Sequence, residues 1–267
     1  MTQPKSSAPQ GTLIVVGTGI KLVSHVTQAA QQAIAQAEVV LFVAGDALVA
    51  TWITRLNPAA ESLHVLYAPG KRRRQTYREM TARILAEVRQ GRQVCAAFYG
   101  HPGVFVRPAH AAIRQARREG FPAGMLPGIS AEDCLFADLE VTPLPAGWQR
   151  YEATDFLQQQ RQFDPTCHLI LWQIGVIGQR HFPADDETGR AGLRQLTHTL
   201  LESYPAGHEV IVYEAAIYPT LAPVIQRQPL ARLPQANVTP LSTLYIPPVA
   251  APRPDPTMLR RLGLANP

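Results

Sequence analysis

An arginine and a tyrosine stand four positions apart in the segment LYAPGKRRRQTYREM, residues 66–80. On a helix, Arg73 and Tyr77 would share one face. A guanidinium beside a phenol favours the phenolate, so the pair could remove a proton from a substrate. Tyr77 also falls on the apolar register of the segment, and the run KRRR at 71–74 could be a solvated basic turn. From these residues alone, a catalytic pair and a core tyrosine both remain open.

A second candidate segment is YGHPGVFV, residues 99–106, which directly follows the apolar run 94–98. Proline and glycine would hold an irregular backbone at the carboxyl end of a strand, where open α/β sheets bind ligands. Free backbone N–H and C=O groups in such a turn suit a ligand with amino-acid-like ends. A hydrogen-bonded structural role would explain His101 by itself. The segment as a whole favours a binding loop.

The segment GTGI, residues 17–20, follows an apolar run and precedes a stretch of helical composition. That is the context of a nucleotide-binding loop. The dinucleotide pattern fails, because Leu22 stands where a third glycine is required and no acidic residue closes a strand about twenty residues later. NAD binding is therefore disfavoured, and a turn that uses glycine for its conformation explains the segment as well as a cofactor loop does.

Apolar runs of strand length recur along the chain and alternate with helix-like stretches, which predicts an α/β fold with mainly parallel strands near the start. The runs are residues 12–19, 39–44, 94–98, 169–174, 210–215 and 242–247. Helical composition begins at Ser24 and continues to Gln36. Further helices are predicted over 72–90, closed by Gly91, and over 108–119, between a proline near the start and a glycine at the end.

The chain divides by composition into four parts. We expect a flexible N-terminus over 1–10, an N-terminal α/β lobe over 11–127, a C-terminal α/β lobe over 128–247 and a Pro-rich tail over 248–267. The lobe boundary is set at the segment LPGIS, where a strand-like stretch turns through proline and glycine. Five prolines between residues 247 and 256 predict that the tail is extended rather than packed.

Composition disfavours several functional classes. The net charge is +5, but outside KRRR the basic residues are scattered, so a nucleic-acid partner is not expected. The three cysteines stand far apart and the eight histidines lack ligand spacing, so we expect neither a disulfide framework nor a metal site. No apolar signal segment or run of ~20 apolar residues is visible. These features predict a cytoplasmic protein without a membrane partner.

The block FYGHPGVFVRPAHAAIRQARREGFPAGMLPGISAEDCLFADLEV, residues 98–141, closely resembles the borosin-type peptide α-N-methyltransferases of the tetrapyrrole methylase superfamily. The stretches YEATDFL at 151–157 and LILWQIGVIG at 169–178 match as well, and the resemblance covers residues 11–247. It implies a two-lobed α/β, tetrapyrrole-methylase-like fold with S-adenosylmethionine in the cleft between the lobes. It also implies an enzyme that methylates backbone amide nitrogens of a ribosomally made peptide.

The resemblance assigns site residues one by one. Those expected to line the cofactor are Tyr99, His101, Val104, Phe105, Ser130, Ala131, Gln173, Tyr213 and Thr243. Arg73 and Tyr77 would be the catalytic pair. Tyr67, which matches another tyrosine of the family, would hydrogen-bond the substrate amide, whereas a further family tyrosine corresponds to His64 in this chain.

Fused members of that family carry their own substrate as a C-terminal extension with a Val/Ile/Gly-rich core. The residues MLRRLGLANP at the end of this sequence lack that composition. We therefore expect a split enzyme that acts on a separate precursor peptide, and the family resemblance implies a homodimer.

Two other functional classes remain open. One is a superfamily methylase for a tetrapyrrole or other small molecule, which would share the cofactor cleft without needing the Arg73–Tyr77 pair. The other is an inactive module that binds cofactor and peptide without turnover. The presence of both Arg73 and Tyr77 favours the peptide methyltransferase.

Overall fold

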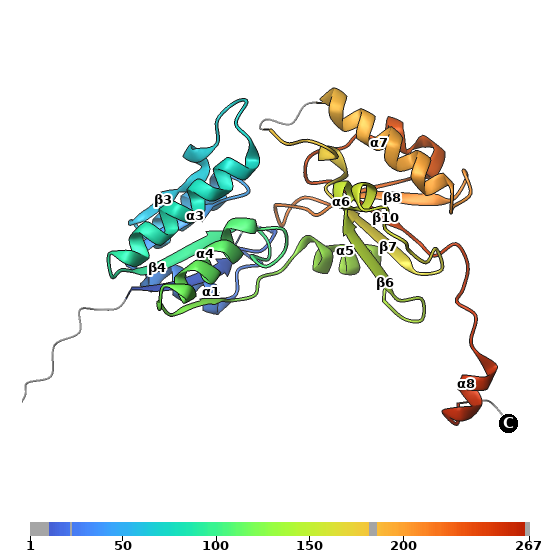
Figure 1. The fold of residues 1–267 in the computed structure, drawn as a ribbon, viewed down its shortest axis with the longest axis horizontal. Coiled ribbons are helices and arrows are strands. Elements are labelled where there is room, and N and C mark those ends of the chain that lie inside the picture. Colours follow the sequence, from blue (N-terminus) through green and yellow to red (C-terminus); the bar gives the residue numbers. More distant parts are fainter. Residues whose placement is uncertain (1–10, 22, 182–185, 265–267) are drawn as a thin grey trace, which may run out of the picture. The chain divides into compact units, whose positions relative to one another are not determined.

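A computed structural model describes residues 11–21, 23–181 and 186–264 (Figure 1). The described residues form two compact units, each with a five-stranded sheet. Among the described residues, the first unit contains 11–139 apart from 22, together with 180–181 and 215–223, and the second contains the others. The division after Leu139 comes later than the boundary predicted after 127, and the chain returns to the first unit twice. The N-terminal segment 1–10 lies outside the described residues.

The sheet of the first unit is entirely parallel, with the strand order β3-β2-β4-β1-β5. Its strands are β1 (Thr12–Gly17), β2 (Val39–Val43), β3 (Ala60–Ser62), β4 (Gln93–Phe98) and β5 (Ala123–Met125). The central strands are near-continuous apolar runs, as parallel strands covered on both faces require. The predicted parallel arrangement near the start of the chain is confirmed.

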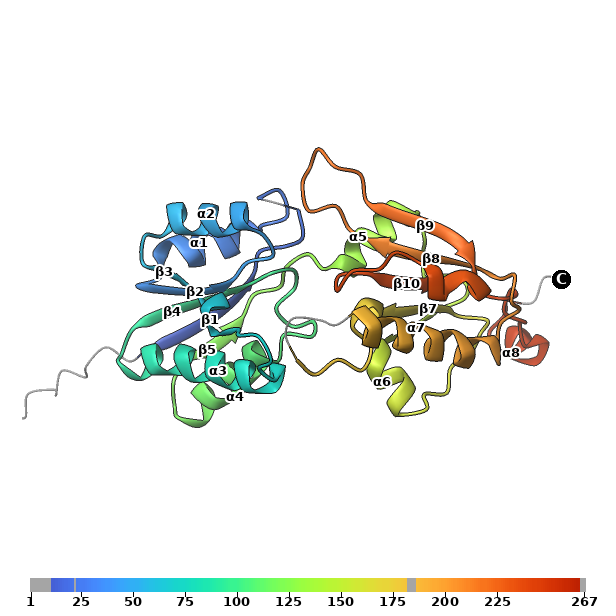
Figure 2. The same cartoon turned by 90° about the horizontal axis from the view of Figure 1, so that it is seen from above.

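Helices cover both faces of this sheet (Figure 2). On one side lie α1 (Gln28–Gln36) and α2 (Ala47–Leu56), and on the other lie α3 (Arg73–Arg89) and α4 (Arg107–Arg118). The neighbouring strands β1 and β4 therefore lead into helices on opposite faces. In an open α/β sheet this switch point opens a crevice at the carboxyl ends of the strands, where ligands bind.

The helix ends follow local signals. The helices predicted over 72–90 and 108–119 are confirmed as α3 and α4, and they end before Gly91 and Gly120, whose φ angles are 84° and 86°. Glycine adopts this left-handed conformation without strain. The first helix begins at Gln28 rather than Ser24, because Thr27 caps it by accepting a hydrogen bond from the Ala30 N–H at 3.1 Å.

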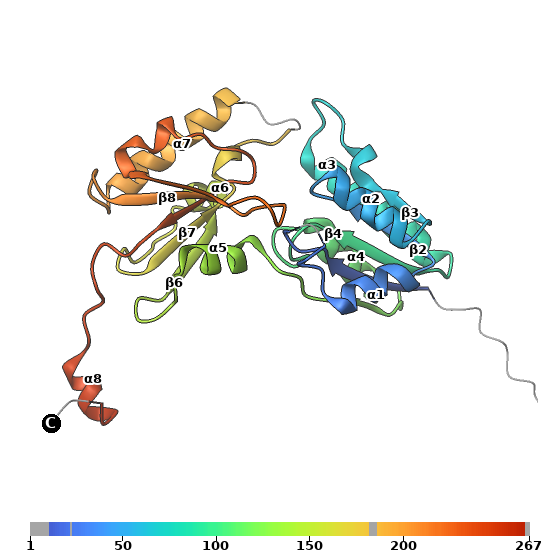
Figure 3. The same ribbon diagram turned by 180° about the vertical axis from the view of Figure 1, so that it is seen from behind.

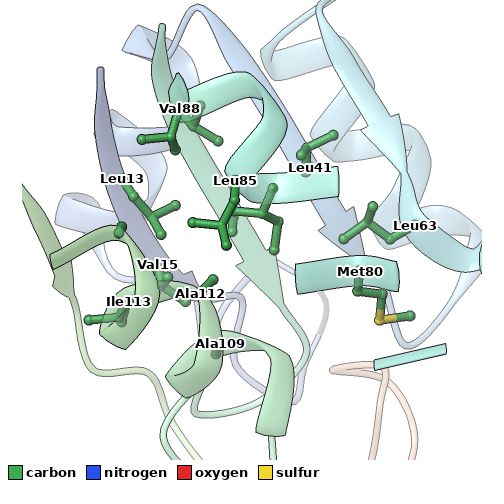
Figure 4. Packing of buried hydrophobic residues seen from close by; sticks show 14 of the residues in the cluster. Leu13, Val15, Leu41, Leu63, Met80, Leu85, Val88, Ala109, Ala112 and Ile113 are labelled. Carbon is green, nitrogen blue, oxygen red and sulfur yellow. The ribbon is translucent and has the colours of Figure 1, made fainter. Parts of the chain in front are cut away.

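A buried apolar cluster between this sheet and α3 and α4 fixes both helices on the strands (Figure 4). Leu13 and Val15 of β1 and Leu41 of β2 face α3 residues such as Met80 and Leu85, all of them nearly inaccessible to solvent. The half-buried side chains of Tyr67 and Tyr77 pack against the same cluster. Tyr77 therefore lies on the apolar face of the helix, as its position in the sequence indicated, but its side chain is only partly buried.

The sheet of the second unit is mixed, with the order β6-β7-β10-β8-β9 (Figure 3). Its strands are β6 (Trp148–Glu152), β7 (His168–Trp172), β8 (Glu209–Glu214), β9 (Val224–Pro229) and β10 (Thr243–Ile246). Only β6 and β7 pair in parallel; the other described pairs are antiparallel. One core cluster joins β7, β8 and β10 to α6 (Ala153–Gln158), α7 (Asp186–Leu201) and the short 3₁₀ helices Ile174–Val176 (η2) and Leu230–Gln235 (η3).

The tail differs from its prediction. Within the segment predicted to be extended, Pro256–Arg261 form a short helix, α8. The carboxylate of Asp255 accepts hydrogen bonds from the Thr257 and Met258 N–H groups at 2.8 and 3.2 Å, and Pro256 occupies the first helical position. Proline is compatible with a helix start because its missing N–H has no helical partner there. The number of prolines therefore misled the prediction, whereas the order Asp-Pro carried the correct signal.

Candidate active site

Three loops meet backbone to backbone at the carboxyl edge of the parallel sheet. A Cβ on Gly17 would lie 2.2 Å from the Gly100 oxygen, and a Cβ on Gly128 would lie 2.7 Å from the same atom. Gly19 and Gly100 also exchange two hydrogen bonds, at 2.9 and 3.2 Å. Only glycine permits this approach. The contact gathers the segments GTGI, YGHPG and LPGIS at the switch point between β1 and β4.

The loop after β4 presents His101 in one defined tautomer. The Gly103 N–H donates to His101 Nδ1 at 2.9 Å, so in the neutral ring Nδ1 is the acceptor and Nε2 carries the proton. The Gly103 carbonyl accepts from His110 Nε2 at 2.9 Å, which ties the loop to α4. His101 thus has the hydrogen-bonded structural role that its sequence position allowed, and it keeps a ring N–H donor.

Apolar surface and backbone strain follow directly in the same loop. Val104 and Phe105 are 40% and 47% exposed, and Phe105 has a φ of 57°, in the left-handed region. This conformation costs an L-residue roughly 1–2 kcal/mol, and strained residues of this kind cluster at ligand sites. Both residues were predicted to line the cofactor.

Tyr99 is held at the base of this loop. Its N–H donates to the Val43 carbonyl at 3.1 Å, and a Cβ on Gly45 would lie 2.6 Å from Cδ2 of its ring. The backbone after β2 therefore lies against the aromatic ring. A second contact holds this turn at the residue after Gly45, where the phenol of Tyr218 donates a hydrogen bond to the carboxylate of Asp46. This hydrogen bond is the main reason that the pKa of Asp46 lies below its ordinary value.

Ser130 and Ala131 occupy the start of α5 (Ala131–Leu139). The Ser130 hydroxyl and N–H both donate to Asp133 Oδ2 at 2.7 Å, and the Asp133 N–H approaches the Ser130 hydroxyl at 3.3 Å. This reciprocal pattern is a capping box. It gives Ser130 a structural role in the turn that follows Gly128, beside whatever contact it makes with a ligand.

Three predicted cofactor residues lie at one edge of the second sheet. Tyr213 and Thr243 are directly opposed across β8 and β10, and both are buried. Gln173 follows β7 with φ 60° and ψ 37°, and the next residue, Ile174, donates its N–H to the Ser242 carbonyl at 3.1 Å. The structure therefore brings these three residues together within the second unit, and only Gln173 keeps an accessible polar side chain.

The predicted catalytic residues converge at the carboxyl edge of the first sheet. Arg73 is the first residue of α3, Tyr77 lies one turn later, and Tyr67 follows the 3₁₀ helix Leu63–Leu66 (η1) after β3. Tyr77 and Arg73 both lie close enough to act on Tyr67: the neighbouring phenol raises its pKa and the guanidinium lowers it. The Arg73 N–H donates to the Arg180 carbonyl at 3.0 Å, which anchors the start of the helix.

The protonation of Tyr67 follows from its surroundings. Burial is the main cause that raises its pKa, the neighbouring Tyr77 raises it too and the Arg73 guanidinium lowers it, with a net value of about 12. A phenol with this pKa is protonated at neutral pH and can donate a hydrogen bond.

His64 stands beside this pair. Its Nε2 lies 2.9 Å from the Ala44 carbonyl, and its ring centroid lies 5.6 Å from that of Tyr67. A carbonyl oxygen can only accept, so Nε2 carries the proton. At the position where the family resemblance led us to expect a tyrosine, His64 thus links η1 to the end of β2 and contacts Tyr67 directly.

Two features of the site were missed. One feature is the set of glycine contacts. Three Gly-containing segments that each follow an apolar run were a signal for it, but which segments meet depends on the order of the strands in the sheet. The Lys71–Glu79 ion pair joins the Tyr67 loop to α3, whereas no role was predicted for Lys71. Within the described residues, we find neither a helix long and apolar enough to cross a membrane nor a group of at least three potential metal ligands.

Comparisons with known proteins agree on one family. A family model described as "Tetrapyrrole (Corrin/Porphyrin) Methylases" matches residues 12–224. Over 97% of this chain, the fold is similar to a crystal structure of uroporphyrin-III-C-methyltransferase from Thermus thermophilus, 98% of which is covered, with a TM-score of 0.63 and 22% sequence identity. At that identity the likeness is one of fold.

Curated relatives are considerably more similar in sequence. Over 245 residues the chain is 40% identical to a "Methyltransferase/ribosomally synthesized type I borosin cyclic peptide precursor" of Coprinopsis marcescibilis, covering 90% of this chain and 63% of that protein. Over 259 residues it is 39% identical to the methyltransferase and omphalotin A precursor of Omphalotus olearius, covering 95% and 62%. The chain spans less than two thirds of these relatives.

Proposed function

This chain belongs to the tetrapyrrole (corrin/porphyrin) methylase family, and we propose that it transfers methyl groups from S-adenosylmethionine to backbone amide nitrogens of a peptide. The relatives whose names combine methyltransferase with borosin peptide precursor support the peptide substrate. The observation that carries the proposal is the convergence of Tyr67, Arg73 and Tyr77 at the sheet edge where the glycine loops meet.

The residues at this edge fit S-adenosylmethionine, which would supply a methyl group already activated on a sulfonium. His101 offers a ring N–H donor, and Val104 and Phe105 offer exposed apolar surface. Gly45 leaves room for the ring of Tyr99. In the second unit the amide of Gln173 is half-buried and offers both a donor and an acceptor. The residues of the first unit would hold the cofactor, with Ser130 and Ala131 shaping the turn after Gly128, whereas Gln173, Tyr213 and Thr243 stay predicted cofactor residues within the second unit.

The chemistry asked of the chain is to make an amide nitrogen nucleophilic. Its lone pair is delocalised into the carbonyl, so the N–H proton must leave as the N–C bond forms. As the phenolate, Tyr77 Oη would accept that proton and become the phenol; a hydrogen bond from Tyr67 and the guanidinium of Arg73 would both favour this negative charge. Arg73 would also stabilise the negative charge that builds on the amide oxygen. Tyr67, which stays protonated, has a single O–H, which can orient Tyr77 or donate to the substrate amide but not both at once.

The arrangement of the peptide remains a prediction. The relatives are named as fusions of enzyme and precursor, whereas we propose that this chain acts on a separate peptide and assembles as a homodimer. Light scattering on the purified chain tests the dimer.

The function is tested by incubating the chain with labelled S-adenosylmethionine and two acceptors in parallel. One acceptor is the set of small peptides encoded beside this chain in its genome, together with a synthetic Val/Ile/Gly-rich peptide. The other is a tetrapyrrole. We expect label in the peptide fraction alone. Label in the tetrapyrrole alone would replace the peptide proposal with a small-molecule methylase. Cofactor binding without label in either acceptor would indicate an inactive module.

A further inference from the structure

The loop that carries Tyr67 is closed onto α3 by a single lysine. The Lys71 ammonium donates to the Leu66 carbonyl at 2.7 Å and forms an ion pair with Glu79 on α3. The other oxygen of Glu79 accepts from the Gln75 side chain at 3.0 Å. Leu66 directly precedes Tyr67, so one cation joins the backbone at Tyr67 to the helix that carries Tyr77.

The backbone hydrogen bonds at Tyr67 and Lys71 are short-range. The Tyr67 N–H donates to the His64 carbonyl and the Lys71 N–H to the Ala68 carbonyl, at 3.0 and 3.1 Å. Both bonds are local to their own turns, and Gly70, with a φ of 72°, has open space around a would-be Cβ. Beside the packing of Leu66 and Tyr67 against the core cluster, the Lys71–Glu79 pair ties this loop to α3.

This ion pair differs from an ordinary surface pair. The Lys71 side chain is 18% exposed and Glu79 is 36% exposed, whereas in the Arg89–Glu119 pair near the other end of α3 the arginine is 49% exposed. The hydrogen bond from Lys71 is the main cause that lowers the pKa of Glu79. Lys71 also donates a hydrogen bond to the Leu66 carbonyl, next to Tyr67. The Arg89–Glu119 pair lies away from Tyr67 and Tyr77.

We propose that Lys71, held by Glu79, is a positioning residue for methyl transfer that keeps the phenol of Tyr67 hydrogen-bonded to Tyr77. This inference rests on the proposed function. Lys71 need not touch the substrate: it fixes the carbonyl before Tyr67, and a displacement of about 1 Å in such a group can lower a rate by a factor of about 100.

The kinetic test uses Lys71→Met and Glu79→Gln, with Arg89→Met as the matched loss of an ion pair elsewhere on α3. The assay uses saturating S-adenosylmethionine and, as the varied substrate, a peptide that the wild-type chain methylates. We expect Lys71→Met and Glu79→Gln to lower kcat roughly 10- to 100-fold with little change in the KM for the peptide. Arg89→Met should leave kcat unchanged. In a Tyr67→Phe background, Lys71→Met should have little further effect, because it acts through the Tyr67 phenol. Equal losses in the two backgrounds would overturn the proposal.

A second measurement needs no substrate. Magnetic resonance of isotopically labelled tyrosine, with Tyr67→Phe to assign the signal, follows the ionisation of Tyr67 directly. We expect its pKa of about 12 to fall towards the ordinary value in Lys71→Met, because the freed loop exposes the phenol, and to stay near 12 in Arg89→Met. An unchanged Tyr67 pKa in folded Lys71→Met would overturn the inference. If the wild-type chain methylates no peptide, the proposed function fails, and this titration still decides whether Lys71 positions Tyr67.

Discussion

The phenol of Tyr67 lies within reach of the phenol of Tyr77, which raises its pKa, although the two residues lie on different elements. Tyr67 stands in the loop after η1, and Tyr77 lies in the first turns of α3. Arg73 stands one turn before Tyr77 and acts electrostatically on Tyr67. A protonated donor, an acceptor and a cation are thus assembled at the carboxyl edge of a parallel sheet, where this fold class places its ligands.

Replacing Tyr77 by phenylalanine removes the hydroxyl that is the proposed proton acceptor and keeps the aromatic ring. The rate of peptide methylation should fall roughly 10²- to 10⁴-fold, the range expected for loss of a general base. Affinity for S-adenosylmethionine, measured by titration calorimetry, should be retained. A variant that methylates peptide as fast as the wild type would exclude Tyr77 as the base and favour a superfamily chemistry that does not need the Arg73–Tyr77 pair.

Alkaline pH should destabilise the protein through Tyr67. Its folded pKa of about 12 lies above the unfolded value of about 10, so the folded state holds this proton more tightly. The stabilisation is complete below pH ~10 and is lost as the pH rises towards 12. Urea unfolding at neutral and alkaline pH should show a smaller loss in Tyr67→Phe than in the wild type. An identical loss in both proteins would contradict the burial of this phenol.

The glycine contact at the sheet edge predicts a sharp contrast between two alanine substitutions. Gly17→Ala would place a Cβ 2.2 Å from the Gly100 oxygen, a backbone atom that cannot move aside. We expect a loss of about 3 kcal/mol in the free energy of unfolding, together with weaker cofactor binding.

Gly124 on β5 provides the control, because its nearest contact would be Ile14 Cδ1 at an ordinary 3.7 Å. Gly124→Ala should leave stability unchanged or raise it by about 0.5 kcal/mol. Equal behaviour of the two variants in urea unfolding would show that the three loops do not meet as described.

Phe105 should display a conflict between stability and binding. Because its φ is 57° and about half of its surface is exposed, Phe105→Gly relieves backbone strain, which offsets the loss of the packing that the ring makes. The free energy of unfolding should hold or rise by up to about 1 kcal/mol, while calorimetry shows weaker binding of S-adenosylmethionine.

Phe105→Ala separates the two effects. It removes the same ring but keeps a Cβ at the strained position, so it should lose affinity without gaining stability. If Phe105→Gly bound the cofactor as tightly as the wild type, the exposed ring would have no part in the site.

The fold could be predicted wherever a local signal decides the structure. Apolar runs such as the one that became β4, and the glycines that end α3 and α4, act through neighbouring residues and the sheet that covers them. The edge strand β9 was missed because its sequence, VIQRQP, alternates exposed and half-buried positions and lacks a buried face. The tail helix α8 was missed because proline content was weighed above the capping signal at Asp255.

The site was predictable in its parts but not in its contacts. The spacing of Arg73 and Tyr77 follows from helix geometry, and the family resemblance added Tyr67. That Tyr67 reaches Tyr77 depends on Lys71 closing a loop onto Glu79, and that Gly17 meets Gly100 depends on β1 lying next to β4. Such contacts are set by strand order and loop closure, which no single stretch of sequence contains.

The most direct test of the account is tandem mass spectrometry of peptide incubated with the wild-type chain and S-adenosylmethionine. The account predicts mass gains in whole multiples of one methyl substitution, with fragments that assign each methyl to a backbone nitrogen, and no such product from Tyr77→Phe. Methyl groups confined to side chains or termini, or an unmodified peptide in the presence of bound cofactor, would contradict it.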